Sequence, residues 1–167
     1  MAELLTHALF AYVLVTLLSV RYPWLTPQYV TVAMMGSLIP DMNRIALAVS
    51  ADTVEGLLGV PFSWGAFHTP AGSLVAAGVG AMLVPDRYRR RVVALLALGV
   101  LSHHALDLLL ASPSGYAYEI FWPLSSVVPP SGGYYLSTDR WPAVLSAVVA
   151  TVVWYVVRYR PDDDSER

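Results

Sequence analysis

The feature that most constrains this chain is a set of five apolar segments, each about as long as a helix that crosses a lipid bilayer. Such a helix needs about 20 mostly apolar residues, in a range of about 17–25. The segments lie at residues 4–20, 29–49, 69–84, 92–111 and 141–157, and Pro40 interrupts the second. Only 13% of the 167 residues are charged, against about 25% in soluble domains. The sequence therefore predicts an all-α, polytopic bundle of about five transmembrane helices.

The remaining composition sets the domain organisation and limits the chemistry. We expect a single transmembrane helical domain over residues 1–160 and an acidic, disordered tail at 161–167. Cysteine is absent, which excludes disulfides and thiolate zinc sites, so any metal ion must be held by nitrogen and oxygen. The net charge of −2 and the lack of a basic run outside residues 87–91 argue against nucleic-acid binding.

The distribution of arginines predicts the orientation. Short loops rich in arginine stay in the cytoplasm. With five spans, one side of the membrane carries Arg21, Arg87, Arg89, Arg90, Arg91, Arg158, Arg160 and Arg167. The opposite side carries only Arg140, with Arg44 near the outer end of the second segment. We therefore expect a multi-pass protein of the cell (inner) membrane with its N-terminus outside and its C-terminus in the cytoplasm.

Ionisable side chains recur at one depth of the predicted bundle, in its outer half. They are His7, Asp41, His68, His103, His104 and Asp107. Charged and imidazole side chains inside a bilayer are costly unless paired, so each needs a partner or a function. Their convergence favours a metal site, although a single histidine in a membrane helix more often bonds a neighbouring helix.

The fourth segment carries the sharpest pattern. His103 and Asp107 are four residues apart and share one helical face, which suits an imidazole and a carboxylate that bind one cation. His104 points about 100° away; it either reaches the same site through Asp107 or bonds a neighbouring helix. Ligands of this mixture suit zinc, manganese or iron.

Three short motifs resemble a known family. They are Leu38-Ile39-Pro40-Asp41-Met42-Asn43, Phe67-His68-Thr69, and Gly99-Val100-Leu101-Ser102-His103-His104-Ala105-Leu106-Asp107, followed by a match from Gly115 to Trp122-Pro123. This order is similar to that of the membrane-bound metal-dependent hydrolases, also labelled LexA-binding, inner-membrane-associated hydrolases. The order His, Asp, His and His-x-x-x-Asp also resembles zinc phospholipase C. Asn43 stands where the family has a second aspartate, and the family's paired His-Arg element is missing.

The resemblance implies hydrolysis of a phosphoester or lipid-like substrate by a metal-activated water at the extracytoplasmic side. The implied metal ligands are His7, Asp41, His68, His103 and Asp107, with zinc as the first choice of metal. Asp41 is either a ligand or the base that takes the water proton. His104 is a further catalytic candidate. Arg44 either clamps a lipid phosphate or pairs with Asp41.

Two alternatives remain open at this stage. The first is a catalytically inactive membrane scaffold in which the polar cluster fixes the packing of the helices. The second is a metal transporter, which the apolar inner halves of the five segments disfavour. Membrane lipids and an amphiphilic phosphoester are the expected partners, and the sequence leaves a homo-oligomer open.

Overall fold

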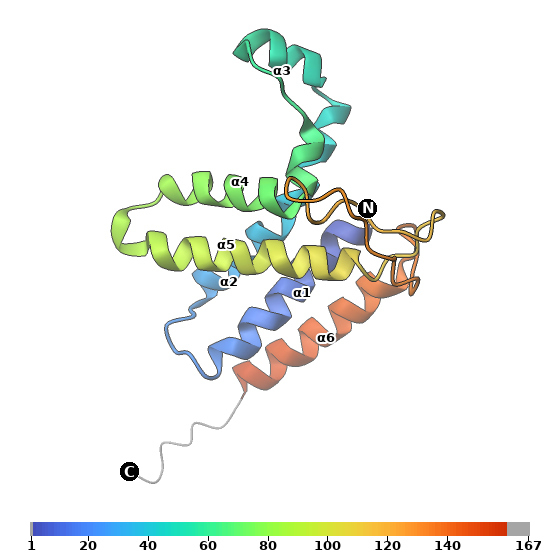
Figure 1. The fold of residues 1–167 in the computed structure, drawn as a ribbon. Helices are drawn as coiled ribbons and strands as arrows, with labels where there is room; N and C mark the ends of the chain where they lie inside the picture. Colours follow the sequence, from blue (N-terminus) through green and yellow to red (C-terminus); the bar gives the residue numbers. More distant parts are fainter. Residues whose placement is uncertain (1, 160–167) are drawn as a thin grey trace.

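The computed structural model describes residues 2–159, and these residues are mainly helical (Figure 1). The α-helices are α1 (Ala2–Ser19), α2 (Pro27–Leu38), α3 (Ala51–Leu58), α4 (Pro70–Met82), α5 (Asp86–Asp107) and α6 (Trp141–Arg158). Two 3-10 helices are η1 (Pro40–Leu47) and η2 (Trp64–His68). Within residues 2–159 the only β-type pairings are isolated bridges, Leu110 with Tyr135 and Tyr116 with Pro130. The all-α prediction is confirmed, and the predicted tail at 161–167 lies outside the described residues.

The long helices pack side by side. α1 packs against both α2 and α6, α2 also packs against α5, and α4 folds back along α5 (Figure 1). The short helix α3 projects away from this bundle. One buried cluster joins α1, α2 and α5 through Val15, Leu25, Val30, Ala33 and Leu95. A second joins α4 and α5 through Ala77, Ala81, Val92, Leu96 and Val100.

The backbones of α2 and α5 approach closely where both helices carry glycine. A Cβ on Gly99 would lie 2.1 Å from the carbonyl oxygen of Ala33, and a Cβ on Gly36 would lie 2.4 Å from that of Leu96. Only glycine leaves room for such an approach, as in membrane helix pairs generally. The contact sets the spacing between α2 and the last two turns of α5, which carry His103 and Asp107.

The predicted second span is not one continuous α-helix. α2 ends at Leu38, and the chain continues from Pro40 as the 3-10 helix η1. Proline has no backbone N–H and its ring clashes with the preceding turn, so an α-helix ends or kinks before it. The segment 29–49 is therefore broken in its middle, and the break places Asp41 at the start of η1.

One helix of the described chain, α6, is both long and apolar enough to cross a membrane. The apolar parts of α1 and α4, Leu4–Ser19 and Pro70–Met82, are shorter. α5 is longer, but its first two turns carry Asp86 and four arginines. The prediction that the apolar segments form helices is confirmed. The lengths and compositions of the described helices do not show a bundle that crosses the membrane five times.

We expect Gly99→Ala to lower the free energy of unfolding by about 1–3 kcal/mol, because the added methyl group overpacks the contact between α2 and α5. The measurement is reversible unfolding of the purified protein in mixed detergent micelles.

The matched control is Gly78→Ala in α4, where an added Cβ meets no atom within 4 Å. This variant should be neutral or more stable by about 0.5–1 kcal/mol, since alanine favours helices over glycine. Equal effects of the two substitutions would contradict the close approach at Gly99.

Candidate functional site

Five ionisable side chains from four segments meet at one end of the bundle. His7 comes from the second turn of α1, Asp41 from the start of η1, His68 from the end of η2, and His103 and Asp107 from the end of α5. Two overlapping groups among them, His7–His103–Asp107 and Asp41–His68–His103, each have ligand atoms within 4.8 Å of one another. The structure thus brings together all five residues that the sequence analysis proposed as metal ligands.

The carboxylate of Asp107 lies at the centre of this cluster. Its Oδ1 lies 3.2 Å from Nε2 of His7, and its Oδ2 lies 3.1 Å from Nε2 of both His68 and His103. Asp107 is only 6% exposed, and His103 is completely buried. Three imidazoles therefore surround one carboxylate that is almost entirely removed from solvent.

Backbone carbonyls determine which ring nitrogen of two of these histidines carries a proton. Nδ1 of His103 lies 2.7 Å from the carbonyl oxygen of Ser37, and Nδ1 of His68 lies 3.3 Å from that of Pro40. A carbonyl oxygen only accepts hydrogen bonds, so Nδ1 is the donor in both rings. In the neutral ring Nε2 then carries a lone pair, and in both histidines this atom faces Asp107.

Lone pairs on neutral imidazoles repel the lone pairs of a carboxylate, so these short distances require a proton or a metal ion between the groups. Nε2 of His103 is buried and has no hydrogen-bond partner. The rings of His7 and His103 stack with centroids 3.8 Å apart.

The spacing of the donors suits a metal ion as well. Ligand atoms about 2.0–2.1 Å from a shared ion lie about 2.8–3.4 Å from one another. The distances of 3.1–3.2 Å around Asp107 fall in this range. Neutral imidazoles oriented by carbonyl oxygens are also the usual arrangement around protein-bound metals. The donor set therefore fits a divalent cation.

A pocket of about 280 Å³ opens beside the cluster and is lined by His7, Asp41, Asn43, Arg44, His68, Asp107 and Leu110. Nε of Arg44 donates to Oδ1 of Asp41 at 2.9 Å, so the predicted alternative of an ion pair between them is present. Oδ2 of Asp41 and Oδ1 of Asn43 are buried and lack a hydrogen-bond partner. The wall of the pocket thus presents two unsatisfied oxygen acceptors.

The protonation of His68 reflects its contact with Asp107. Burial lowers the pKa of His68, but the hydrogen bond to Asp107 and the negative charge of Asp107 outweigh this effect and raise the pKa above its usual value. In the absence of a metal ion, His68 is therefore well placed to hold a proton beside the carboxylate.

His104 belongs to a neighbouring hydrogen-bond chain. Ser73 donates its hydroxyl proton to the carbonyl oxygen of Phe67, and its Oγ lies 3.4 Å from Nε2 of His104. Ser73 therefore accepts from Nε2, which leaves Nδ1 to accept from the hydroxyl of Tyr118. Burial, together with the charge of Asp107, raises the pKa of Tyr118 and keeps it protonated. His104 thus offers no nitrogen to the cluster in this arrangement.

Tyr118 is a site residue that the sequence analysis did not single out. It lies in the segment between α5 and α6, and its ring centroid is 5.1 Å from that of His68. In the sequence it is one of several aromatic residues in 112–140, and no local pattern distinguishes it from the others. Its role depends on how this segment folds over the end of α5.

An apolar groove of about 950 Å³ runs between α2 and α4. Its lining includes Met42 and Phe67, each next in sequence to a cluster residue, and no charged residue. The remaining lining residues are Val32, Met35, Leu38, Ile39, Val75, Ala76, Val79, Gly80, Leu83, Val84, Val92 and Leu96.

We expect Tyr118→Phe to lower the free energy of unfolding by about 1 kcal/mol and to speed hydrogen exchange in residues 108–140, because Nδ1 of His104 loses its donor. Hydrogen–deuterium exchange with mass spectrometry measures the local effect. Tyr116→Phe is the control, since the side chain of Tyr116 is 56% exposed. An equal effect of both changes would contradict the role of the hydroxyl.

No curated protein and no solved structure matches the chain. One family model, described as YdjM inner membrane protein, matches residues 1–162. This match spans all four segments that supply the cluster. The chain therefore belongs to the YdjM inner membrane protein family.

Proposed function

We propose that this inner membrane protein is a metal-dependent hydrolase that cleaves a phosphoester in an amphiphilic substrate. The observation that carries the proposal is the set of three Nε2 atoms 3.1–3.2 Å from the carboxylate oxygens of Asp107. Two of these nitrogens belong to rings whose Nδ1 already donates to a carbonyl oxygen. A site that only joined helices would gain little from such an arrangement, since polar contacts between membrane helices contribute about 0.6 kcal/mol on average.

His7, His68, His103 and Asp107 would hold the ion, with zinc as the first choice and manganese or iron as alternatives. A bound divalent cation polarises a phosphoryl oxygen and lowers the pKa of a bound water to about 7. Asn43 adds a neutral oxygen at the pocket wall, where it has no hydrogen-bond partner.

Asp41 would take the proton from the attacking water. Its Oδ2 is buried and unpartnered at the pocket, while its Oδ1 is held by Arg44. The contact with Arg44 orients the carboxylate, as a general base requires. Arg44 also lines the pocket, where its positive charge suits a phosphate group of the substrate.

The apolar groove between α2 and α4 supports an amphiphilic substrate. Its walls are apolar and include Met42 and Phe67, the sequence neighbours of Asp41 and His68. A phosphate group in the polar pocket and a hydrocarbon chain in this groove would each meet matching surroundings.

We further propose that the chain crosses the membrane about five times, with the cluster toward the extracytoplasmic side. Helices other than α6 also expose large apolar side chains. In α4, Val75, Val79 and Met82 are 58–68% exposed. Such surfaces are unfavourable in water and suit lipid. The arginine distribution supports an external N-terminus and a cytoplasmic C-terminus.

Metal content tests the site directly. Protein purified in detergent without chelators should contain about one or more zinc, manganese or iron ions per chain by elemental mass spectrometry. His103→Ala and Asp107→Ala should each lose most of this metal, because each removes a ligand atom from the centre of the cluster.

The control is His104→Gln, which changes the adjacent histidine without removing a nitrogen that faces Asp107. It should keep its metal, and circular dichroism should show that all variants remain helical. A wild-type protein without metal, even after reconstitution, would overturn the proposal and favour the inactive scaffold.

Catalysis is tested with detergent-dispersed phospholipids, by release of the phosphate-bearing headgroup. Asp41→Asn should lower kcat by about 10²-fold or more, because the amide cannot accept the water proton. Asp52→Asn, an exposed acidic residue of α3, should leave kcat unchanged. A metal-loaded wild-type protein that cleaves no phosphoester would overturn the proposed reaction while leaving the metal site intact.

A further inference from the structure

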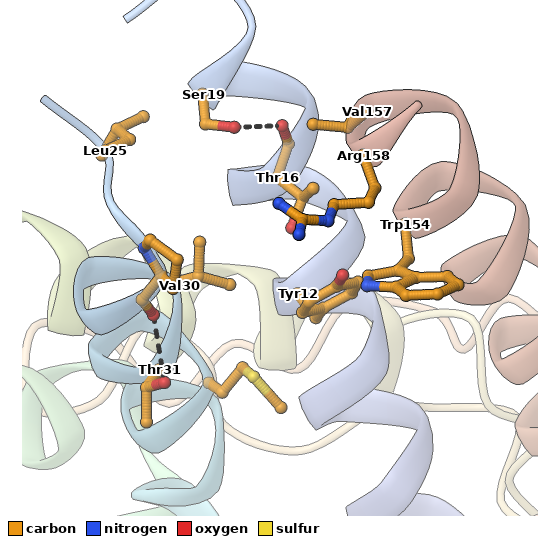
Figure 2. Close-up of a pocket in the computed structure, with 11 residues that line it drawn as sticks. Tyr12, Thr16, Ser19, Leu25, Val30, Thr31, Trp154, Val157 and Arg158 are labelled. Atoms are coloured by element: carbon orange, nitrogen blue, oxygen red, sulfur yellow. Dashed lines mark hydrogen bonds between the residues drawn. The ribbon is translucent and has the colours of Figure 1, made fainter. Parts of the chain in front are cut away.

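A second pocket lies at the opposite end of the bundle, between α1, α2 and α6. Its volume is about 610 Å³ (Figure 2). It is lined by the last two turns of α1, the start of α2 and the last turns of α6. The cluster of histidine and aspartate side chains lies at the other ends of α1 and α2, so this pocket has no part in the proposed reaction.

Arg158 supplies the charge of this pocket. Figure 2 shows its side chain extending from α6 toward α1, with the guanidinium beside Thr16. No residue that lines the pocket is acidic. Among residues 2–159 no carboxylate forms an ion pair with Arg158. The pocket therefore carries a positive charge with no counterion in the described part of the chain.

Thr16 provides a second, independent observation. Thr16 is only 7% exposed, and its Oγ1 is buried without a hydrogen-bond partner. In helices a threonine hydroxyl commonly donates to a carbonyl one turn earlier. Here the hydroxyl proton has no acceptor in the described structure, although it lies in the wall beside the guanidinium (Figure 2). A ligand oxygen in the pocket would satisfy both donors.

The rest of the lining indicates the kind of anion. Trp154 and Tyr12 also line the pocket (Figure 2), and Leu25, Val30, Met34 and Val157 complete the wall. Aromatic side chains of this kind favour the headgroup layer of a membrane. The pocket also lies at the end of α6, the described helix that is long and apolar enough to cross the bilayer.

We infer that this pocket binds the phosphate group of an anionic membrane lipid. The phosphate oxygens accept from the guanidinium of Arg158 and from the hydroxyl of Thr16. The acyl chains contact the apolar part of the pocket wall, which includes Leu25, Val30 and Val157. This site is independent of the metal cluster, and the positive-inside distribution of arginines places it in the cytoplasmic leaflet.

Lipid binding to the full chain in detergent tests the inference, by native mass spectrometry and by titration with short-chain phosphatidylglycerol. Arg158→Gln should weaken this binding about tenfold or more, because a charge-assisted hydrogen bond is lost. Thr16→Val, which keeps the shape of the side chain, should weaken it several-fold. Diacylglycerol, which lacks the phosphate, should bind wild type and variants equally.

Arg90→Gln is the matched control. It removes the same charge from an exposed position of α5 that does not line the pocket, so phosphatidylglycerol binding should stay unchanged. Equal losses in Arg90→Gln and Arg158→Gln would show unspecific attraction and overturn the inference. Saturation by inorganic phosphate at the same concentration would show a free-anion site and also overturn it.

The acidic run at 162–166 is the competing occupant from the chain itself. Replacing Asp162, Asp163 and Asp164 by asparagine should leave the stability of the lipid-free protein unchanged. If these changes instead lower stability as much as Arg158→Gln does, the tail is the counterion of Arg158 and the lipid site is overturned. Metal content, measured in parallel, should be the same in every one of these variants.

Discussion

The contact between the Asp107 carboxylate and three imidazoles is the interaction on which the site end of the structure depends. It ties α1, η2 and α5 together through His7, His68 and His103. A carboxylate that is 94% buried is unfavourable unless its charge is compensated. The neutral imidazoles cannot compensate it by themselves, since lone pairs of His68 and His103 point at it. A proton on His68, whose pKa the contact with Asp107 raises, or a cation bound between these groups would compensate the charge.

Close packing of α2 and α5 makes this geometry possible. The glycines at 36 and 99 let the two backbones approach until the carbonyl oxygen of Ser37 reaches Nδ1 of His103. The break at Pro40 then turns the chain so that its carbonyl oxygen lies near His68 while Asp41 enters the pocket. The two features together orient two imidazoles and one carboxylate through backbone atoms, which move little compared with side chains.

The two ends of the bundle have opposite chemistry. The end with the cluster holds an excess of Lewis bases and unsatisfied acceptors, namely imidazole nitrogens and the oxygens of Asp41 and Asn43. The other end holds Arg158 and the donor hydroxyl of Thr16 in a pocket without acidic residues. One end suits a metal cation and the other an anion. A membrane protein can keep both because the apolar helix centres separate them.

The sequence by itself determined the helical class, the break at Pro40 and the identity of the cluster residues, because each follows from local rules. Apolar runs predict helices, proline ends one, and ionisable residues in apolar segments must find partners. The tertiary structure decided how those residues are used. His103 and His104 are neighbours in sequence, yet one faces Asp107 and the other bonds Ser73 and Tyr118. Contacts between distant segments give Tyr118 its hydrogen-bond partner and bring Thr16 and Arg158 into one pocket. No local pattern in the sequence records these contacts.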